Sequence, residues 1–219
     1  MRVPRAVLAS VVAGMVSSAL QPAVGAAAPA DPASLVTELG AQLGQVLSDR
    51  TLSPVAQKER FHAILDADFD FPVISRFVLG RYWQGSNDAF HREFVSVFED
   101  YVIQSLSARF AVYSGDSIRV MGTHSESEHS TIVSTTIVHP DGTSQPNVDW
   151  RVQDKSAGLK IADVSVAGVS MAVSYREQIA AVIDRDGGQV ASVISTLREK
   201  IDNSTRHVPP AMGRKFGAQ

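Results

Sequence analysis

The chain of 219 residues contains no cysteine. Disulfide bonds are therefore excluded, and the fold must be held together by its hydrophobic core. The same absence excludes a lipoprotein anchor, because that anchor is attached to a cysteine. With 44% hydrophobic and 20% charged residues, the composition is typical of a globular protein, and the length is sufficient to bury a sizeable core.

An excess of positive charge is also missing. Twenty Lys and Arg stand against 23 Asp and Glu, for a net charge of −3, which becomes −5 when Arg2 and Arg5 are removed with the N-terminal segment described next. A mildly acidic chain is a poor candidate for binding nucleic acid, so no nucleic-acid partner is expected. The sequence also has no polybasic cluster for an anionic membrane surface.

The apolar run at the N-terminus is too short to span a membrane comfortably. Residues 7–20 carry no charge, but a spanning helix needs about 20 residues. Arg2 and Arg5 precede this run, and the small residues AVGAAAPA follow it. This order is typical of a secretory signal peptide rather than an anchor, with cleavage after Ala26 or Ala28. We therefore predict a signal peptide over residues 1–28 and a mature protein in a bacterial periplasm.

Helical patterns fill the first half of the mature chain. Asp31-Pro32 and Ser53-Pro54 each combine an N-cap residue with proline at the first helical position. Asp70 can cap a third, short helix that ends at Gly80. Ser86 or Asn87 begins a fourth helix, the longest, whose apolar residues recur every three or four positions.

From Gly115 the hydrophobic period changes to that of strands. Four strands are predicted, linked by turn residues into an antiparallel meander, over residues 117–123, 129–139, 145–154 and 159–166. The capping box Ser174-x-x-Glu177 then predicts a helix, and a final amphipathic helix follows. The expected fold is one α+β domain over residues 29–202, with a curved four-stranded sheet covered by N- and C-terminal helices, and a disordered polar tail over residues 203–219.

Large apolar side chains are concentrated between Phe69 and Tyr113. This stretch holds seven of the nine phenylalanines, and Phe90, Phe94 and Phe98 form a stripe on the longest predicted helix. Such a stripe either fills a core or lines a ligand cavity, and the pattern alone is compatible with both.

Residues that could carry chemistry are few. Ser170 lies in GVSMA, which resembles a nucleophile elbow but lacks its final glycine, so we interpret Ser170 as a loop or cap residue. The spacing of His124, His129 and His139 matches no metal motif. Asp163 interrupts an apolar strand, and a structural salt bridge with Arg176 is favoured over a catalytic acid. No catalytic residue, metal site or cofactor is therefore predicted.

Several segments together resemble one known family. FVLGRYW at residues 77–83, followed by an F-x3-F-x3-F-x2-Y helix from Phe90 to Tyr101, is similar to the MlaC or toluene-tolerance family. The same family is also resembled by VDWRV at residues 148–152, LKIADV at 159–164, AGVSM at 167–171 and the pair Tyr175-Arg176. Ala167 departs from the usual Glu-Gly-Val-Ser form of the family. The resemblance runs from about Leu35 to Ile201.

The resemblance implies a soluble periplasmic carrier of phospholipid. Such carriers exchange lipid between an outer-membrane lipoprotein complex and an inner-membrane ABC transporter with an MCE ring. Their sheet resembles that of nuclear transport factors, with helices closing a deep apolar pocket. A related branch is associated with hopanoids, so a hopanoid cargo is an alternative.

Lipid-binding residues are expected on the aromatic stretch and on one face of the sheet. They are Phe77, Tyr82, Trp83, Phe94, Phe98, Tyr101, Val133, Val148, Trp150, Ile161 and Val164. Two other interpretations stay open. One is a small-molecule enzyme on the same type of scaffold, and the other is an interaction module whose aromatic stripe is ordinary core.

Overall fold

The structure is a computed structural model that describes residues 31–110, 117–139, 141–143 and 147–206. The predicted signal peptide lies outside the described residues, as do residues 207–219 of the predicted tail. The last helix continues to Arg206, so residues 203–206 belong to a helix rather than to the tail. In the described part of the chain, no helix is both long enough and apolar enough to cross a membrane.

The first three helices begin where their capping signals predict. They are α1 (Pro32–Ser48), α2 (Pro54–Asp68) and α3 (Phe71–Leu79). Asp31 accepts a hydrogen bond from the Ser34 amide at 2.9 Å, and Ser53 accepts one from the Ala56 amide at 3.2 Å. The Asp70 carboxylate caps α3 through the Val73 amide in the same way. Each side chain satisfies an amide that would otherwise lack a partner at the helix start.

Gly80 turns the chain sharply at the end of α3. Its φ angle is +56°, in the left-handed region that favours glycine, and a Cβ there would lie 3.0 Å from the Arg176 side chain. The short helix α4 and the long helix α5 follow, over Arg81–Gln84 and Asp88–Phe110. The break at Gly80 therefore sends the RYW segment away from the axis of α3.

The sheet has five strands rather than the predicted four. The strands are β1 (Ser117–Ser127), β2 (Ser130–Val138), β3 (Val148–Lys155), β4 (Gly158–Val166) and β5 (Val169–Ser170). They pair in sequence order, and each pair is antiparallel. The additional strand is a two-residue segment in which Val169 pairs with Val166 across a tight turn. Periodicity could not reveal it, because two residues carry no alternation.

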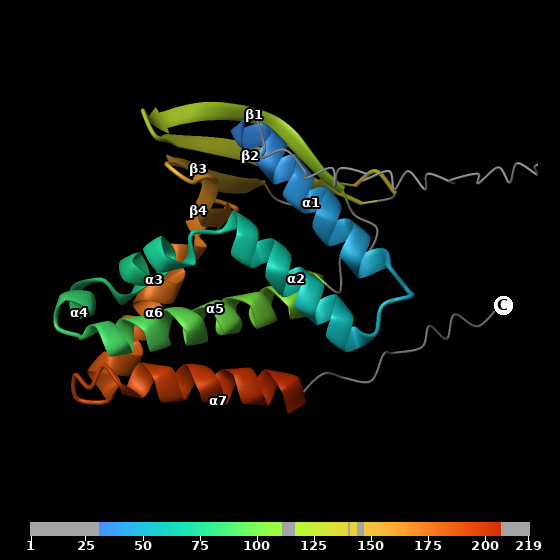
Figure 1. Cartoon of the computed structure of the whole chain (residues 1–219). Helices are drawn as coiled ribbons and strands as arrows, with labels where there is room; N and C mark the ends of the chain where they lie inside the picture. The colour runs from blue at the N-terminus through green and yellow to red at the C-terminus, as the bar shows by residue number, and fades with distance from the viewer. Residues whose placement is uncertain (1–30, 111–116, 140, 144–146, 207–219) are drawn as a thin grey trace, which may run out of the picture.

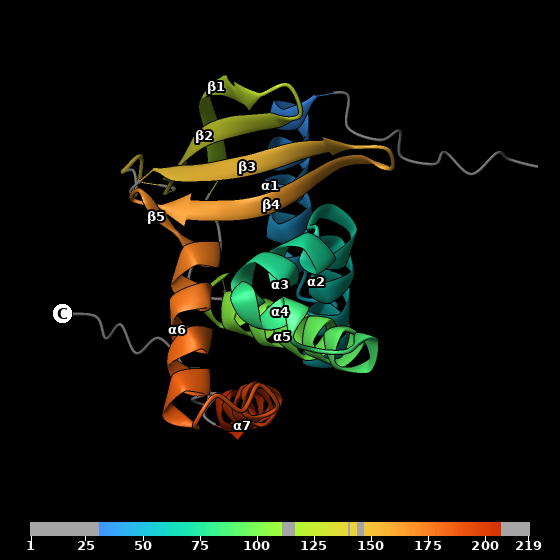
Figure 2. The same cartoon turned by 90° about the vertical axis from the view of Figure 1, so that its left-hand side faces the viewer.

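The last two helices connect the sheet to the helical layer. They are α6 (Met171–Arg185) and α7 (Ser192–Arg206). The predicted start of α6 at Ser174 is wrong, since the Ser170 hydroxyl caps the helix by accepting from the Val173 amide. Figure 2 shows α6 running from the β5 edge of the sheet to α7.

The molecule has a sheet layer and a helical layer. Helix α1 lies against one face of the curved sheet, and α2, α3, α5 and α7 lie farther from that sheet (Figure 1). On β3, Val148, Trp150 and Val152 are buried and alternate with more exposed residues, as the sequence predicts. Trp150 lies opposite Val133 on one side and Val164 on the other.

Candidate functional site

A cavity of about 270 Å³ lies between the sheet and the helices. Helix α1 and the sheet form one part of its wall, and α2, α3, α5 and α6 contribute the remainder. Gly44, Ser117 and Val166 are the lining residues that are exposed to solvent. The described residues that line it are Leu39, Gly40, Leu43, Gly44, Leu47, Leu65, Phe69, Phe71, Ile74, Phe98, Val102, Leu106, Ser117, Ile118, Thr135, Ile137, Val148, Trp150, Asp163, Val164, Val166, Met171, Ala172 and Tyr175.

The wall of the cavity is almost entirely apolar. None of the described residues that line it is Lys, Arg, His or Glu. Two polar groups of the wall are satisfied by protein partners: the Trp150 indole N–H donates to Thr135 Oγ1 at 2.9 Å, and the Thr135 hydroxyl donates to the Val148 carbonyl at 2.9 Å. The cavity therefore offers a ligand large apolar contact and little hydrogen bonding.

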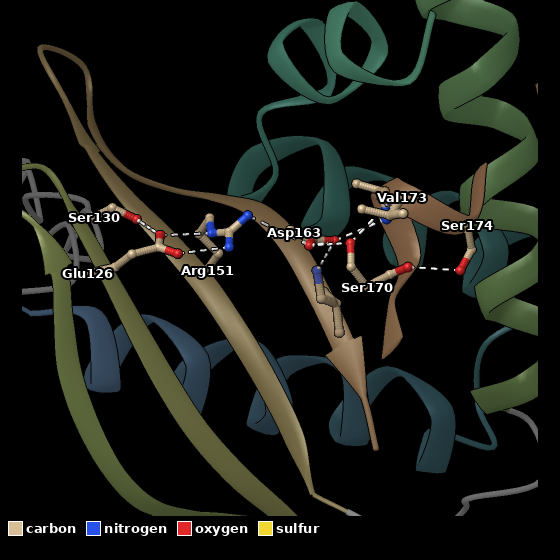
Figure 3. Close-up of polar contacts among 9 residues, drawn as sticks. Glu126, Ser130, Arg151, Asp163, Ser170, Val173 and Ser174 are labelled. Carbon is tan, nitrogen blue, oxygen red and sulfur yellow. Dashed lines mark hydrogen bonds and ion pairs between the residues drawn. The ribbon is translucent and has the colours of Figure 1, made fainter. Parts of the chain in front are cut away.

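Among the described residues of this wall, Asp163 is the single carboxylate, and it is 7% exposed. Its Oδ1 accepts hydrogen bonds from the amides of Val164 and Ala172, at 2.8 and 3.0 Å, and its Oδ2 accepts one from the Ser170 hydroxyl at 2.6 Å (Figure 3). These bonds hold the first turn of α6 against the end of β4. The negative charge also lies at the N-terminus of α6, where it is favourable.

The predicted pairing of Asp163 with Arg176 is wrong. Its cation is Arg151, whose Nη1 lies 3.9 Å from Oδ2, because Arg151 pairs with Asp163 across the β3–β4 ladder. Arg176 instead lies over the Phe77 ring, 5.2 Å from its centroid. Ser170, interpreted from the sequence as a loop or cap residue, does cap α6 through the Val173 amide, and Asp163 holds the same turn through Ser170 and the Ala172 amide.

Arg151 extends the network to the protein surface. Its guanidinium donates two hydrogen bonds to Glu126, at 2.9 and 2.8 Å, and the Ser130 hydroxyl donates a third. The bonds from Arg151 and then Ser130 hold the pKa of Glu126 below its usual value. Figure 3 shows these side chains in a row along the sheet, from Glu126 to Ser170.

Four of the predicted lipid-binding residues lie in the wall of this cavity. They are Phe98 on α5, Val148 and Trp150 on β3, and Val164 on β4. Phe94, Val133 and Ile161 are buried in the core beside it without lining it. Tyr101 lines a separate, smaller void. Contact of any of these residues with lipid stays a prediction.

The FVLGRYW segment does not reach the cavity. Phe77 is 42% exposed on the outer side of α3. Tyr82 donates a hydrogen bond to Asp184 at 2.7 Å, and Trp83 stacks on His91 with ring centroids 3.9 Å apart. The turn at Gly80 explains this placement, because it separates α4 from the direction of α3.

Helix α1 supplies five lining residues that the sequence interpretation treated only as cover. These residues repeat every four positions, on the side of α1 that lines the cavity: Leu39-Gly40, Leu43-Gly44 and Leu47. A Cβ at Gly40 would lie 2.8 Å from Ile118 Cδ1, whereas a Cβ at Gly44 would have no neighbour within 4 Å. Glycine is unfavourable inside a helix. Two glycines at this spacing were therefore the sequence signal that α1 either approaches another element closely or borders an open space.

The three histidines considered above as metal ligands were not predicted to form a metal site. His124 and His129 are exposed, and no three His, Cys, Asp or Glu side chains in the described ranges are placed to share a metal ion.

Comparisons with known proteins give one family and one fold. The model of the MlaC protein family matches residues 34–199. The solved structure of a phospholipid-binding protein from Ralstonia solanacearum, in complex with a phospholipid, is similar with a TM-score of 0.70 and 18% sequence identity. The similarity covers 80% of this chain and 99% of that chain, and at this identity it shows a shared fold. No match was found among curated proteins.

Proposed function

Because the chain belongs to the MlaC protein family, we propose that it binds lipid in the apolar cavity and carries it between membranes. The observation that carries this proposal is the cavity itself, whose wall combines aliphatic and aromatic side chains from the sheet and five helices. Acyl chains are a suitable ligand, because they need apolar contact and no hydrogen bonds.

The energetics suit a carrier. Burying a methylene group is worth about 0.8 kcal/mol. Two acyl chains of roughly 15 methylenes each therefore gain on the order of 24 kcal/mol of free energy when they move from water into the cavity. The same chains gain a similar free energy in a bilayer. Exchange between membrane and cavity is therefore nearly neutral, and the direction of transport must come from the partners.

Phospholipid is the cargo we propose first. The similar protein from Ralstonia solanacearum was solved with a phospholipid, and it shares the fold of this chain. A hopanoid is the alternative, because a related branch of the resembled family is associated with hopanoids. A rigid polycyclic ring system and flexible acyl chains make different demands on the same cavity, so extraction of bound lipid distinguishes the two.

The location and partners follow from the family resemblance. We propose that the protein works in the periplasm, after removal of residues 1–28. Its partners would be an inner-membrane ABC transporter with an MCE ring and an outer-membrane lipoprotein complex. A carrier of this kind loads and releases lipid at those partners and needs no chemical step of its own.

Binding is also favoured over catalysis by the contacts of Asp163. Both oxygens of this carboxylate are engaged by groups that begin α6, and Arg151 faces it from β3. A general acid or base must instead reach a substrate. The network therefore supports a structural role for the ionisable group in the wall.

A pair of charge substitutions on β3 tests the proposal. Val148 and Val152 are both buried valines of one strand, but only Val148 lines the cavity. After incubation with phosphatidylglycerol vesicles, we expect Val148→Asp to contain no bound phospholipid and folded Val152→Asp to contain as much as the wild type. Circular dichroism identifies the folded variants, and Phe98→Asp is the second cavity variant. Normal lipid content in a folded cavity variant would contradict the proposal.

A further inference from the structure

A second, much smaller void lies on the far side of Tyr175 from the cavity. It has a volume of about 20 Å³ and lies between α5, α6 and α7. Apolar and aromatic residues form most of its wall, and four of them, Phe98, Ile179, Val193 and Leu197, are buried. Gln178, Thr196 and Lys200 are the polar members of its lining. The void therefore continues the apolar character of the cavity toward α7.

Two aromatic side chains line both spaces. Phe98 on α5 and Tyr175 on α6 each contact the cavity on one side and the void on the other. Their ring centroids are 5.5 Å apart with an interplanar angle of 88°, and Tyr175 makes a similar edge contact with Tyr101 at 5.9 Å. We refer to the two rings that both linings share, Phe98 and Tyr175, as the partition.

The two members of this partition differ in burial. Phe98 is fully buried and also stacks on Phe94, with ring centroids 5.7 Å apart. Tyr175 is half-buried and belongs to α6, the helix that leaves the edge of the sheet. Removing the ring of Tyr175 would therefore join the cavity to the void, while Phe98 would stay part of the core.

The void suits the end of an acyl chain better than it suits water. A space of this size is about that of one water molecule, which needs 2 to 4 polar partners to be stable. Ile179, Val193 and Leu197 offer none from their side chains, and two of the three polar lining residues, Gln178 and Lys200, are exposed to solvent. A terminal methylene or methyl group needs only apolar contact.

We propose that Tyr175 closes the inner end of the lipid cavity and sets the length of acyl chain that the protein accepts. This inference rests on the proposed function, because it assigns a selectivity to the same cavity. In the wild-type protein the ring stops the chain between Phe98 and the first turn of α6. A smaller residue at this position admits further methylenes into the void.

The test measures which chain lengths the protein selects. Protein without bound lipid is incubated with vesicles of phosphatidylglycerols of four chain lengths, myristoyl to arachidoyl, in equal amounts. It is then separated from the vesicles, and the bound lipid is quantified by mass spectrometry. We expect Tyr175→Ala to shift the bound lipid to longer chains than the wild type, by roughly fourfold for each further methylene accommodated.

Three further variants make the result specific. Tyr175→Phe retains the ring and should bind the same chain lengths as the wild type. Ile179→Ala enlarges only the void, so we expect no shift alone and an additional shift in combination with Tyr175→Ala. If Tyr175→Ala does not fold, Tyr175→Leu provides the same measurement with a smaller loss of volume.

The outcomes separate this inference from the proposed function. An unchanged distribution in folded, lipid-loaded Tyr175→Ala or Tyr175→Leu overturns the role of Tyr175 and leaves lipid binding intact. A shift in Ile179→Ala alone also overturns it, because the partition would then not be closed. Wild-type protein that takes up no lipid overturns both.

Discussion

Asp163 shows at the residue scale how a charge can lie in an apolar wall. Its two oxygens accept three hydrogen bonds, two of them from backbone amides, and Arg151 lies 3.9 Å away. A buried carboxylate is tolerated only with such partners. Its effect is to attach α6, and with it Tyr175, to the end of β4.

We predict unequal costs for removing the two carboxylates of this network. Asp163→Ala leaves the amides of Val164 and Ala172 without their partner and should lower the free energy of unfolding by about 3 kcal/mol. Glu126→Ala removes a half-exposed ion pair with Arg151 and should cost about 1 kcal/mol or less. Urea unfolding of both variants measures the difference, and equal losses would contradict the structural role of Asp163.

Glu99 on α5 predicts a pH-dependent stability. Burial, and then the nearby Asp66 carboxylate, raise its pKa, while His62 acts in the opposite direction. The Glu99 carboxyl therefore binds its proton more tightly in the folded protein than in the unfolded chain. Its contribution to the free energy of unfolding is fully present below the unfolded pKa of about 4.3 and is lost as the pH rises through the pKa of the folded protein. We expect Glu99→Gln to be more stable than the wild type at pH 7, with no such gain well below pH 4.

The control for Glu99 is another carboxylate of the same helix. Glu93 is exposed and pairs with Arg198 at 2.8 Å, so Glu93→Gln should leave the stability unchanged or lower it slightly at pH 7. Chemical unfolding at the two pH values compares both variants with the wild type. A gain for Glu99→Gln that persists undiminished in acid would show that the charge of Glu99 is not its cause.

At the scale of elements, α1 carries a contrast between two glycines one turn apart. Gly44→Ala should raise the free energy of unfolding by about 0.5–1 kcal/mol, because alanine favours the helix and its Cβ has no neighbour within 4 Å. Gly40→Ala should gain less or lose stability, because its Cβ would lie 2.8 Å from Ile118 Cδ1. Thermal unfolding tests the pair, and an equal gain at both positions would contradict the close contact between α1 and β1.

The elements themselves were largely predictable from local signals. Asp31, Ser53 and Asp70 cap the helices that their positions predict, because an N-cap acts within one turn. The start of α6 was missed although its cap, Ser170, also acts within one turn, and Asp163 adds a contact from β4 to the Ala172 amide nine residues later. A capping box at Ser174 could not reveal a contact that forms only when β4 and α6 meet.

At the scale of the whole molecule, the cavity depends on how the two layers are oriented. Phe94 and Phe98 are one turn apart on α5 and are equally buried, but only Phe98 lines the cavity. Helical periodicity predicts the buried face of α5 and not the rotation of that face relative to the sheet. For the same reason the sequence could not separate Val148 and Val164, which line the cavity, from Val133 and Ile161, which do not, and it missed the share that α1 contributes.

The most direct test of a lipid-binding cavity is to identify what the protein holds. Mature protein would be purified without detergent and extracted with organic solvent, and the extract analysed by lipid mass spectrometry beside folded Val148→Asp. We predict phospholipid in near-stoichiometric amount from the wild type and its loss from the variant. Hopanoid in place of phospholipid would change the cargo and keep the cavity, whereas an extract without lipid from folded wild-type protein would contradict the account.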